Sequence, residues 1–510
     1  MGTGFRASMD WLHTWAGVVL GGLLFAIFWM GTLSVFDREI DRWMAPMTRL
    51  APTDQMTAVE ALRASYEAAA AARATSWFAQ LPTERAPVLQ VTWREGARQL
   101  VRLIDPATGT ALPDPGTWAG TGFLYPFHYM LHVRLGYWIV GVAGMAMLLL
   151  CVSGVVIHRK IFADFFTFRA DKQPRRLVLD LHNVTGVLGL PFHFMITLSG
   201  VIIFYGVYFP GTIQFAYGDE ARAFAREAYG NYDRPRLGKS GALASLDGMV
   251  AEARRLWDGE TPRYLFVRHP GDAAAVVQVA RHGEDRVAGR SDIAYFDATT
   301  GALLQQRIAP QPVLSAQRFI AGLHLIQFRH WTLRWVYFAL GLTGCALIAT
   351  GYLFWLESRK KKDGRLGPRG VRLVEALTVG SVSGIVIATL SFFVSNRLLP
   401  LGAVFLGEDR ATLEMWVFHL VWLGTLAHAA LRSRRAWSEQ FGAIAALALA
   451  AVILNWITTG DHLGRSLGQA HLWPVAGMDI LLIGSAATTA WAAFALGRRR
   501  ARATSLGPAR

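Results

Sequence analysis

The sequence predicts an α-helical polytopic membrane protein, with about eight transmembrane helices and two small α+β modules outside the membrane. Three observations predict this fold class. The 510 residues are 53% hydrophobic, eight runs of about 20 apolar residues occur along the chain, and every second connector between runs is short and basic. A helix needs about 20 apolar residues to cross the hydrocarbon core of a bilayer, so each run is long enough to span it.

The apolar runs give the order of the predicted spans. They cover approximately residues 12–36, 134–157, 183–209, 332–356, 373–395, 412–431, 438–457 and 475–496. The first run is too long for a secretory signal peptide, and the charged sequence Asp37-Arg38-Glu39 follows it where a cleavage site would have small residues. We therefore expect the first run to be a membrane span.

The net charge of +15 is concentrated in the connectors. Basic residues in short loops are typical of the cytoplasmic side of a membrane, so we expect both termini in the cytoplasm and the protein in a bacterial inner membrane. Topology and contact with anionic lipids account for the charge, and no nucleic-acid partner is expected. The basic connectors cover residues 159–176, 359–369, 432–435 and 498–502.

The chain contains an internal repeat. The first span begins LHTWAGVVLG and the third begins LHNVTGVLGL, so an offset of 169 residues places His13 on His182. The second and fourth spans also match, because VSGVVIHRK near Gly154 resembles ATGYLFWLESRK near Gly351. Two such repeats predict a bundle of four helices. The last four spans have no module between them and form an appendage.

A polar segment inside each repeat has the pattern of an α+β module. The first segment, roughly 53–118, opens with an alanine-rich helical stretch at 57–74, and the second, roughly 240–312, has one at 243–257. Apolar residues at every second position then indicate half-buried strands, such as VLQVTWR and YLFVRH. Asp-x-x-Thr-Gly sequences typical of hairpin turns occur at residues 105–109 and 297–301.

These patterns divide the chain into ten segments. The predicted spans of the bundle are residues 8–36, 128–158, 181–209 and 324–357, the modules are residues 37–127 and 210–323, the cytoplasmic loops are residues 159–180 and 358–372, and the appendage and basic tail are residues 373–497 and 498–510.

The chain resembles the PepSY-associated transmembrane proteins. The LH-x-x-x-G starts at residues 12 and 181, the Asp-x-x-Thr-Gly modules, and the FHYMLH and HRKIFADFFTFR stretches carry this resemblance, which covers about residues 8–360. The family includes iron-regulated membrane proteins and siderophore reductases that bind haem b in the bundle. The resemblance therefore implies a haem-b membrane protein of iron acquisition. Only some longer members have the four C-terminal spans.

His13 and His182 begin the first and third spans at equivalent repeat positions. Polar side chains in or near spans are costly and often functional, and neutral imidazole is a common axial ligand of haem iron. If the repeats are related by a pseudo-twofold axis, the two histidines face each other and suit one haem with two axial imidazoles. His158, at the end of the second span, is a competing or additional ligand, or an interfacial histidine beside Arg159.

Four histidines lie at the outer ends of the spans: His128, His132, His324 and His330. His128 and His132 are four residues apart and share a face if the helix extends that far. His324 and His330 are about 240° apart around a helix, so they cannot both point at one centre. We favour His132 and His324 as the outer haem pair, with His128 and His330 as alternatives. Together with the inner pair, His13 and His182, this outer pair predicts two b-type haems.

His193 follows Pro191, about 16 Å along the third span from His182, and has no counterpart in the first repeat. It is either a ligand of an inner haem or a buried histidine bonded to a neighbouring helix. In the appendage, His419 and His428 are nine residues apart and point to opposite faces of one helix. We interpret them as polar contacts between helices.

Haem in a membrane bundle moves single electrons. No G-x-G-x-x-G follows a strand, so no nucleotide-binding domain is expected, and the electron donor would be membrane quinol or a separate cytoplasmic reductase. The resemblance implies ferric siderophore as the acceptor, with no side chain assigned a catalytic role. Two alternatives are a siderophore transporter, which would need broken helices or charged residues at mid-membrane, and a non-redox binding or regulatory protein, which would hold no haem.

Overall fold

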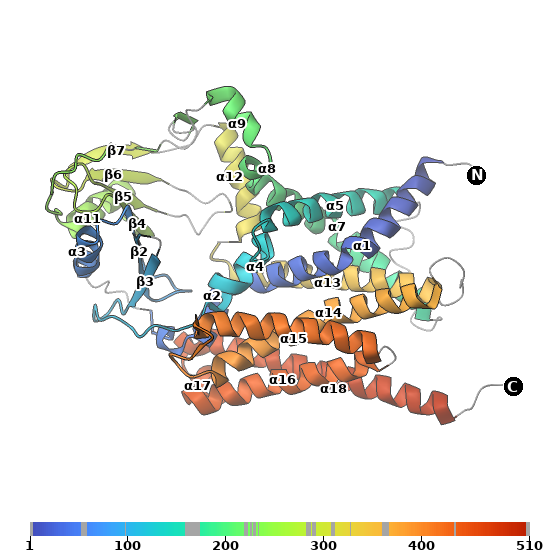
Figure 1. Ribbon diagram of the computed structural model, residues 1–510. Coiled ribbons are helices and arrows are strands. Elements are labelled where there is room, and N and C mark those ends of the chain that lie inside the picture. Colours follow the sequence, from blue (N-terminus) through green and yellow to red (C-terminus); the bar gives the residue numbers. More distant parts are fainter. Residues whose placement is uncertain are drawn as a thin grey trace. The chain divides into compact units, whose positions relative to one another are not determined.

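The chain forms two compact units (Figure 1). Unit 1 contains residues 1–46, 116–201 and 331–510, and unit 2 contains residues 47–115 and 202–330. Residues 159–173 of the predicted loop 159–180 and residues 360–366 of the predicted loop 358–372 lie outside the described residues. The computed structural model describes residues 4–52, 59–96, 98–158, 174–218, 223–224, 227, 231–232, 234–281, 287, 292–307, 312–326, 328–359, 367–432 and 435–505.

Unit 1 contains the four helices of the predicted N-terminal bundle, which are α1 (Phe5–Ser34), α5 (Gly136–Ile157), α7 (Pro174–Ile203) and α13 (Trp331–Arg359). Helix α1 packs against both α5 and α13. Gly144 of α5 lies against Val201 of α7, and Gly186 of α7 lies against Leu347 of α13. The four helices therefore form a ring in the order α1, α5, α7, α13, with small residues where the backbones approach.

The appendage packs against this ring within unit 1. Trp29 of α1 donates its indole N–H to the Thr389 hydroxyl of α14 over 3.0 Å. Short helices connect the long ones, and α1 begins at the same end of the unit as α18 ends (Figure 1). The long helices of the appendage are α14 (Gly367–Leu398), α15 (Arg410–Arg432), α16 (Ala436–Thr459) and α18 (Trp473–Ser505). The connecting helices include α2 (Asp37–Met44), α4 (Tyr125–Met130), α17 (Leu463–Gly468) and the π-helix η3 (Ala119–Leu124).

Seven described helices are long and apolar enough to cross a membrane: α1, α5, α7, α13, α14, α16 and α18. The remaining predicted run forms the 23-residue helix α15, which is not among the seven. Helix α15 packs along α14, where the Trp422 indole donates to the Gly380 carbonyl over 3.0 Å. The chain is therefore a multi-pass membrane protein, as the runs of apolar residues predict.

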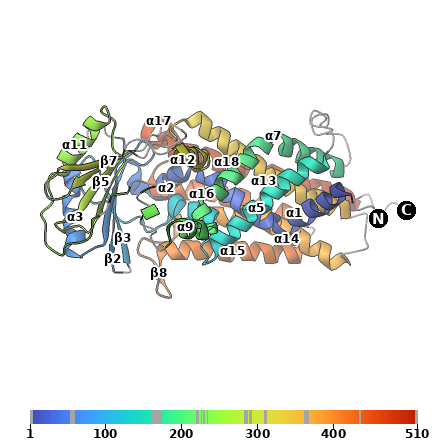
Figure 2. The same ribbon diagram turned by 90° about the horizontal axis from the view of Figure 1, so that it is seen from above.

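Unit 2 contains one seven-stranded antiparallel sheet in the order β3-β2-β1-β4-β5-β6-β7. Figure 2 labels four of its strands, β2, β3, β5 and β7. Helices α3 (Arg63–Ala71) and α11 (Leu246–Leu256) share a core with the strands, in which Tyr66 and Met249 from the helices pack with Trp77 and Val267 from the sheet. The strands are β1 (Ser76–Gln80), β2 (Leu89–Glu95), β3 (Arg98–Ile104), β4 (Tyr264–Arg268), β5 (Val276–Ala280), β6 (Ile293–Asp297) and β7 (Leu303–Arg307). Three further helices in the unit are α8 (Tyr205–Tyr208), α9 (Pro210–Tyr217) and α12 (Pro312–Leu325).

The two predicted modules are halves of this single sheet. Strand β1 of the first half pairs with β4 of the second, with Phe78 opposite Phe266. This pairing satisfies two strand edges that separate modules would leave exposed. The sequence analysis assigned no strand to β1, because Trp77, Phe78 and Ala79 are three adjacent apolar residues and do not alternate with polar ones.

Both Asp-x-x-Thr-Gly turns form as predicted. The amide of Gly109 donates to the Asp105 carbonyl, and the amide of Gly301 donates to the Asp297 carbonyl. The two glycines have φ values of 70° and 73°, a left-handed conformation that glycine adopts without steric cost. The repeat detected in the sequence therefore holds for the turn geometry of unit 2.

Candidate functional site

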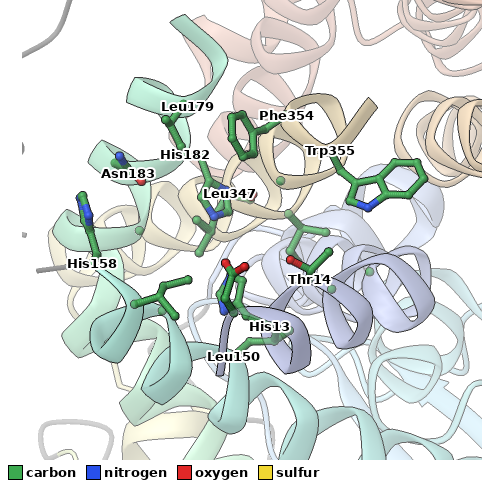
Figure 3. Close-up of a pocket in the computed structure, with 18 of the residues that line it drawn as sticks. His13, Thr14, Leu150, His158, Leu179, His182, Asn183, Leu347, Phe354 and Trp355 are labelled. Carbon is green, nitrogen blue, oxygen red and sulfur yellow. Dashed lines mark hydrogen bonds between the residues drawn. The ribbon is translucent and has the colours of Figure 1, made fainter. Parts of the chain in front are cut away.

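His13 of α1 and His182 of α7 lie next to each other inside unit 1. Their ring centroids are 6.4 Å apart and their ring planes make an angle of 84°. Figure 3 shows the two side chains extending from their helices toward one another. The fold thus brings together the two histidines that the sequence repeat aligned.

Hydrogen bonds fix which nitrogen of each imidazole carries the proton. The Nδ1 of His182 lies 2.9 Å from the Leu347 carbonyl oxygen, which can only accept, so Nδ1–H is the donor. The Nδ1 of His13 lies 3.0 Å from the Ser153 hydroxyl oxygen. That hydroxyl donates its own hydrogen to the Leu149 carbonyl, so it accepts from His13. Both neutral rings therefore have the lone pair on Nε2.

Each imidazole also lies over a glycine of the neighbouring helix. A Cβ atom on Gly154 of α5 would come within 3.3 Å of His13 Cε1, and one on Gly351 of α13 within 3.2 Å of His182 Cε1. Both distances are shorter than ordinary van der Waals contact, so a larger residue would displace the ring. The two glycines are 197 residues apart, which is the offset that aligns the second and fourth spans.

The hydroxyl groups beside the histidines follow the same offset. Ser153 of α5 corresponds to Thr350 of α13, and the Thr350 hydroxyl lies 3.4 Å from His182 Nδ1. Each hydroxyl donates to the carbonyl four residues earlier in its helix, with distances of 2.6 Å for Ser153 and 2.7 Å for Thr350. The two imidazoles therefore have equivalent surroundings. Sequence reasoning did not assign a role to Ser153 or Thr350, although the aligned VSG and ATG sequences contain both.

The two rings line a cavity of about 970 Å³ between α1, α5, α7 and α13. This volume is at the upper end of the range for small-molecule sites. Its wall is mostly apolar, with Leu24, Met147 and Leu190 among the lining residues, and His158 and His193 also contribute. The four-helix ring therefore encloses a pocket large enough for a cofactor.

His158 lies at the C-terminal end of α5, and its Nε2 is buried without a hydrogen-bond partner among the described residues. In Figure 3 it lies to one side of the pair formed by His13 and His182. The sequence left its role open between an iron ligand and an interfacial histidine. Because His158 lines the cavity, its side chain is placed to contact a ligand bound there.

His193 is fully buried further along α7, which continues through Pro191 without a break. Its Nε2 lies 3.2 Å from the Thr343 hydroxyl and 3.3 Å from the Leu340 carbonyl of α13. These contacts match the expected bond to a neighbouring helix. Its Nδ1 is buried and has no partner among the described residues.

His128 and His132 do not share a helical face, contrary to the condition under which the sequence paired them. Helix α4 ends at Met130, and Leu131 and His132 both have positive φ values. The Nδ1 of His128 lies 2.8 Å from the Ile27 carbonyl of α1. The Nε2 of His132 instead lies 2.9 Å from the Phe123 carbonyl. The left-handed residues turn His132 away from the direction of α4.

His324 and His330 belong to unit 2. His324 lies in the last turn of α12 and is half-buried, whereas His330 is exposed. His132 belongs to unit 1, so the pairing of His132 with His324 stays a prediction, as do the alternatives with His128 and His330. A group of three or more His, Cys, Asp or Glu side chains suited to a metal ion is not found among the described residues.

Comparison with known proteins gives two matches. The family model described as the PepSY-associated TM region matches residues 11–358. An uncharacterized protein of Pseudomonas aeruginosa, PA4219, is 30% identical over 279 residues, which cover 51% of this chain and 68% of that protein. The family match contains α5, α7 and the sheet of unit 2, and most of α1 and α13.

Proposed function

The chain belongs to the family of the PepSY-associated TM region, and we propose that it is a haem-b membrane oxidoreductase that passes single electrons across the bacterial inner membrane. The acceptor is a ferric siderophore outside the cytoplasm, from which iron leaves as Fe(II). The observation that carries the proposal is the pair of symmetry-equivalent imidazoles in the cavity.

The spacing of this pair fits one metal ion between two imidazoles. Imidazole nitrogens bind first-row metals at about 2 Å, and a ring centroid lies about 1 Å beyond its nitrogen. Two rings on opposite sides of one metal therefore have centroids about 6 Å apart, and those of His13 and His182 are 6.4 Å apart. Ligating histidines also commonly donate the other ring N–H to a carbonyl or hydroxyl, as both do here.

A macrocycle explains why two protein ligands would be sufficient. The cavity wall supplies imidazoles, without a nearby group of three or more metal-ligating side chains among the described residues. A porphyrin supplies four equatorial nitrogens by itself, so its iron needs only two axial ligands from the protein. The largely apolar cavity of about 970 Å³ suits the apolar ring. We therefore assign His13 and His182 to one haem, and a second haem near the other end of the helices stays a prediction.

Bound haem would supply one-electron chemistry at the site. His13 and His182 would hold the iron, the acceptors beside them keep the proton on each Nδ1, and the apolar wall would exclude water. The donor class is a quinol, which gives up two electrons and two protons in all, or a separate cytoplasmic reductase. Each electron that reaches a ferric siderophore converts one Fe(III) to Fe(II), which hard oxygen ligands bind less tightly.

The test is an absorption spectrum of the detergent-purified chain, oxidised and then reduced with dithionite, with a pyridine haemochrome count. We expect the sharp reduced bands of low-spin haem b, at about two haems per chain if the outer site exists and about one if it does not. A chain purified from haem-replete cells without a Soret band would reject the reductase. A transporter or a non-redox binding protein would then be the better account.

Reduction itself is tested on the haem-loaded chain in vesicles that contain quinol. A ferric siderophore and a ferrous-iron chelator are added on the side of unit 2. Formation of the coloured ferrous complex, with reoxidation of the haem at the same rate, is the expected result. Haem that stays reduced when the ferric siderophore is added would contradict the proposed acceptor and leave the electron-transfer role intact.

A further inference from the structure

Two buried ring nitrogens in the cavity wall, each able to carry a hydrogen, have no hydrogen-bond partner among the described residues. They are Nε2 of His158 and Nε1 of Trp355. The indole N–H can only donate, and the Trp355 side chain is buried, with 6% of its surface exposed. Buried polar groups in folded proteins nearly always have partners, so these two groups indicate a ligand that carries acceptors.

The two groups obey the internal symmetry of the site. His158 and Trp355 are 197 residues apart, the same offset that relates Gly154 to Gly351. Each lies four residues after the glycine that supports a histidine ring, which is about one helical turn, or 6 Å, further along its helix. In Figure 3, His158 and Trp355 lie on opposite sides of the pair formed by His13 and His182.

The same part of the cavity wall is positively charged. Arg6, Arg175 and Arg359 line the cavity, and Asp10 is the single acidic residue among the described lining residues. The Arg359 guanidinium lies over the Trp355 ring, 5.2 Å from its centroid, and Arg6 Nε donates to the Ile157 carbonyl, next to His158, over 3.1 Å. The Ser358 hydroxyl is also buried without a partner among the described residues. An anionic acceptor fits these surroundings.

The geometry points to His158 and Trp355 as the anchors of the two propionate carboxylates of the haem held by His13 and His182. This inference rests on the proposed function. The two carboxylates of haem b are on one edge of the ring and are related by its approximate twofold axis, as the two N–H groups are related by the repeat. Each N–H donates to one carboxylate, and the arginines balance the two negative charges.

This assignment gives His158 a role other than iron ligation. An anchor needs only a hydrogen on the atom that faces the carboxylate, which glutamine also supplies, whereas an iron ligand needs the imidazole lone pair. His158→Gln therefore separates the two roles. Reduction adds an electron to the site, so donors and cations near the carboxylates favour the reduced form. Their loss lowers the midpoint potential.

The experiment titrates the haem-depleted full chain with haem b and with its dimethyl ester, in which both carboxylates are methylated. We expect the wild-type chain to bind haem b at least tenfold more tightly than the ester. Trp355→Phe and His158→Leu each reduce this ratio several-fold and lower the midpoint potential. His158→Gln retains most of the ratio. Trp491→Phe, which changes an exposed tryptophan of α18, is the matched control and leaves both readouts unchanged.

The outcomes separate this inference from the proposed function. A wild-type chain that binds neither haem b nor the ester rejects the proposed function. A wild-type chain that binds both equally tightly keeps the haem and rejects the carboxylate anchors. Retained binding of the ester by the Trp355 and His158 variants shows that they are folded. Loss of the ester from His158→Gln and His158→Leu alike would make His158 an iron ligand instead.

Discussion

The four-helix ring (α1, α5, α7 and α13) and the four long helices of the appendage use buried polar side chains in different ways. In the ring, His13 and His182 use Nδ1 for hydrogen bonds and have the Nε2 lone pair beside a cavity. In the appendage, His428 is engaged on both sides, with Nε2 2.9 Å from Glu439 and Nδ1 3.4 Å from Gln440. The contact to Glu439 joins α15 to α16, as the sequence predicted for this histidine.

Asp479 and Glu414, two buried carboxylates of the appendage, also have hydrogen-bond partners in the protein itself. Asp479 of α18 accepts the indole N–H of Trp43 over 2.8 Å and lies 3.5 Å from the Asn455 amide. Glu414 of α15 accepts hydrogen bonds from Thr117 and Asn396. These groups hold helices together. A buried histidine thus indicates a ligand site when one of its nitrogens lacks a protein partner and faces a cavity. Burial in the membrane is not by itself a sign of a ligand site.

The comparison predicts the largest effect for the paired histidines. His13→Ala and His182→Ala each remove one axial ligand, so each variant is expected to lose about one haem per chain. The haemochrome count of the purified variants measures this loss. His428→Ala is the control from the appendage and should keep the wild-type count. A His428 variant that loses as much haem as the His13 variant would contradict the distinction between the histidines of the ring and those of the appendage.

A second prediction concerns the glycines beneath the rings. Gly351→Val adds side-chain atoms against the His182 ring, since a Cβ atom at this position would lie only 3.2 Å from His182 Cε1. We therefore expect most of the inner haem to be lost while the helix persists. The control is Gly442→Val on α16, where a Cβ atom would meet nothing within 4 Å. Haem content and circular dichroism of both variants give the test. An unchanged haem content in Gly351→Val would mean that the ring moves aside without losing the ligand.

In the appendage, loss of a buried hydrogen bond is expected to lower the stability of the chain and not its haem content. Asp479→Leu leaves the fully buried Trp43 indole without this acceptor, at a cost of about 1–3 kcal/mol. Thermal unfolding of the purified chain should therefore shift to lower temperature, with an unchanged haem count in the protein that remains folded. Asp479→Asn retains an acceptor oxygen and should shift the unfolding less. Specific loss of haem from a folded Asp479→Leu chain would extend the cofactor site into the appendage.

The smallest effect is expected in unit 2, at the Asp297 turn. Burial alone would raise the pKa of Asp297, but hydrogen bonds from the Thr299 hydroxyl and the Arg234 guanidinium outweigh it and hold the pKa well below its usual range. The resulting stabilisation is present above about pH 4, the usual carboxyl pKa, and is lost as the pH falls through the lower folded value.

Hydrogen exchange of the β6–β7 segment measures this dependence. Protection should decrease as the pH is lowered below about 4, after correction for the intrinsic exchange rate. Asp297→Asn should weaken this dependence, because it removes the titrating group and keeps one acceptor oxygen. An equal acid response in the variant would assign the effect to other carboxylates of unit 2.

Much of the architecture follows from local patterns in the sequence. The apolar runs identify the membrane helices because their length must match the bilayer. Alternation identifies strands such as β2 and β4 because one face of each is buried. The repeat in the sequence aligns His13 with His182 and Gly154 with Gly351. The aligned positions kept equivalent neighbours because two similar sequences folded into two similar halves.

Other features depend on contacts between distant segments, which sequence periodicity does not contain. The pairing of β1 with β4 makes one sheet of two predicted modules. The left-handed backbone at Leu131 and His132 ends the helix that would have aligned His132 with His128. The sequence by itself determined the membrane class, the repeat and the inner pair of histidines. Only the tertiary structure decided which ring nitrogens of the cavity wall are hydrogen-bonded and which have no partner among the described residues. The physical reason is that hydrogen bonds at these nitrogens come from groups on other helices.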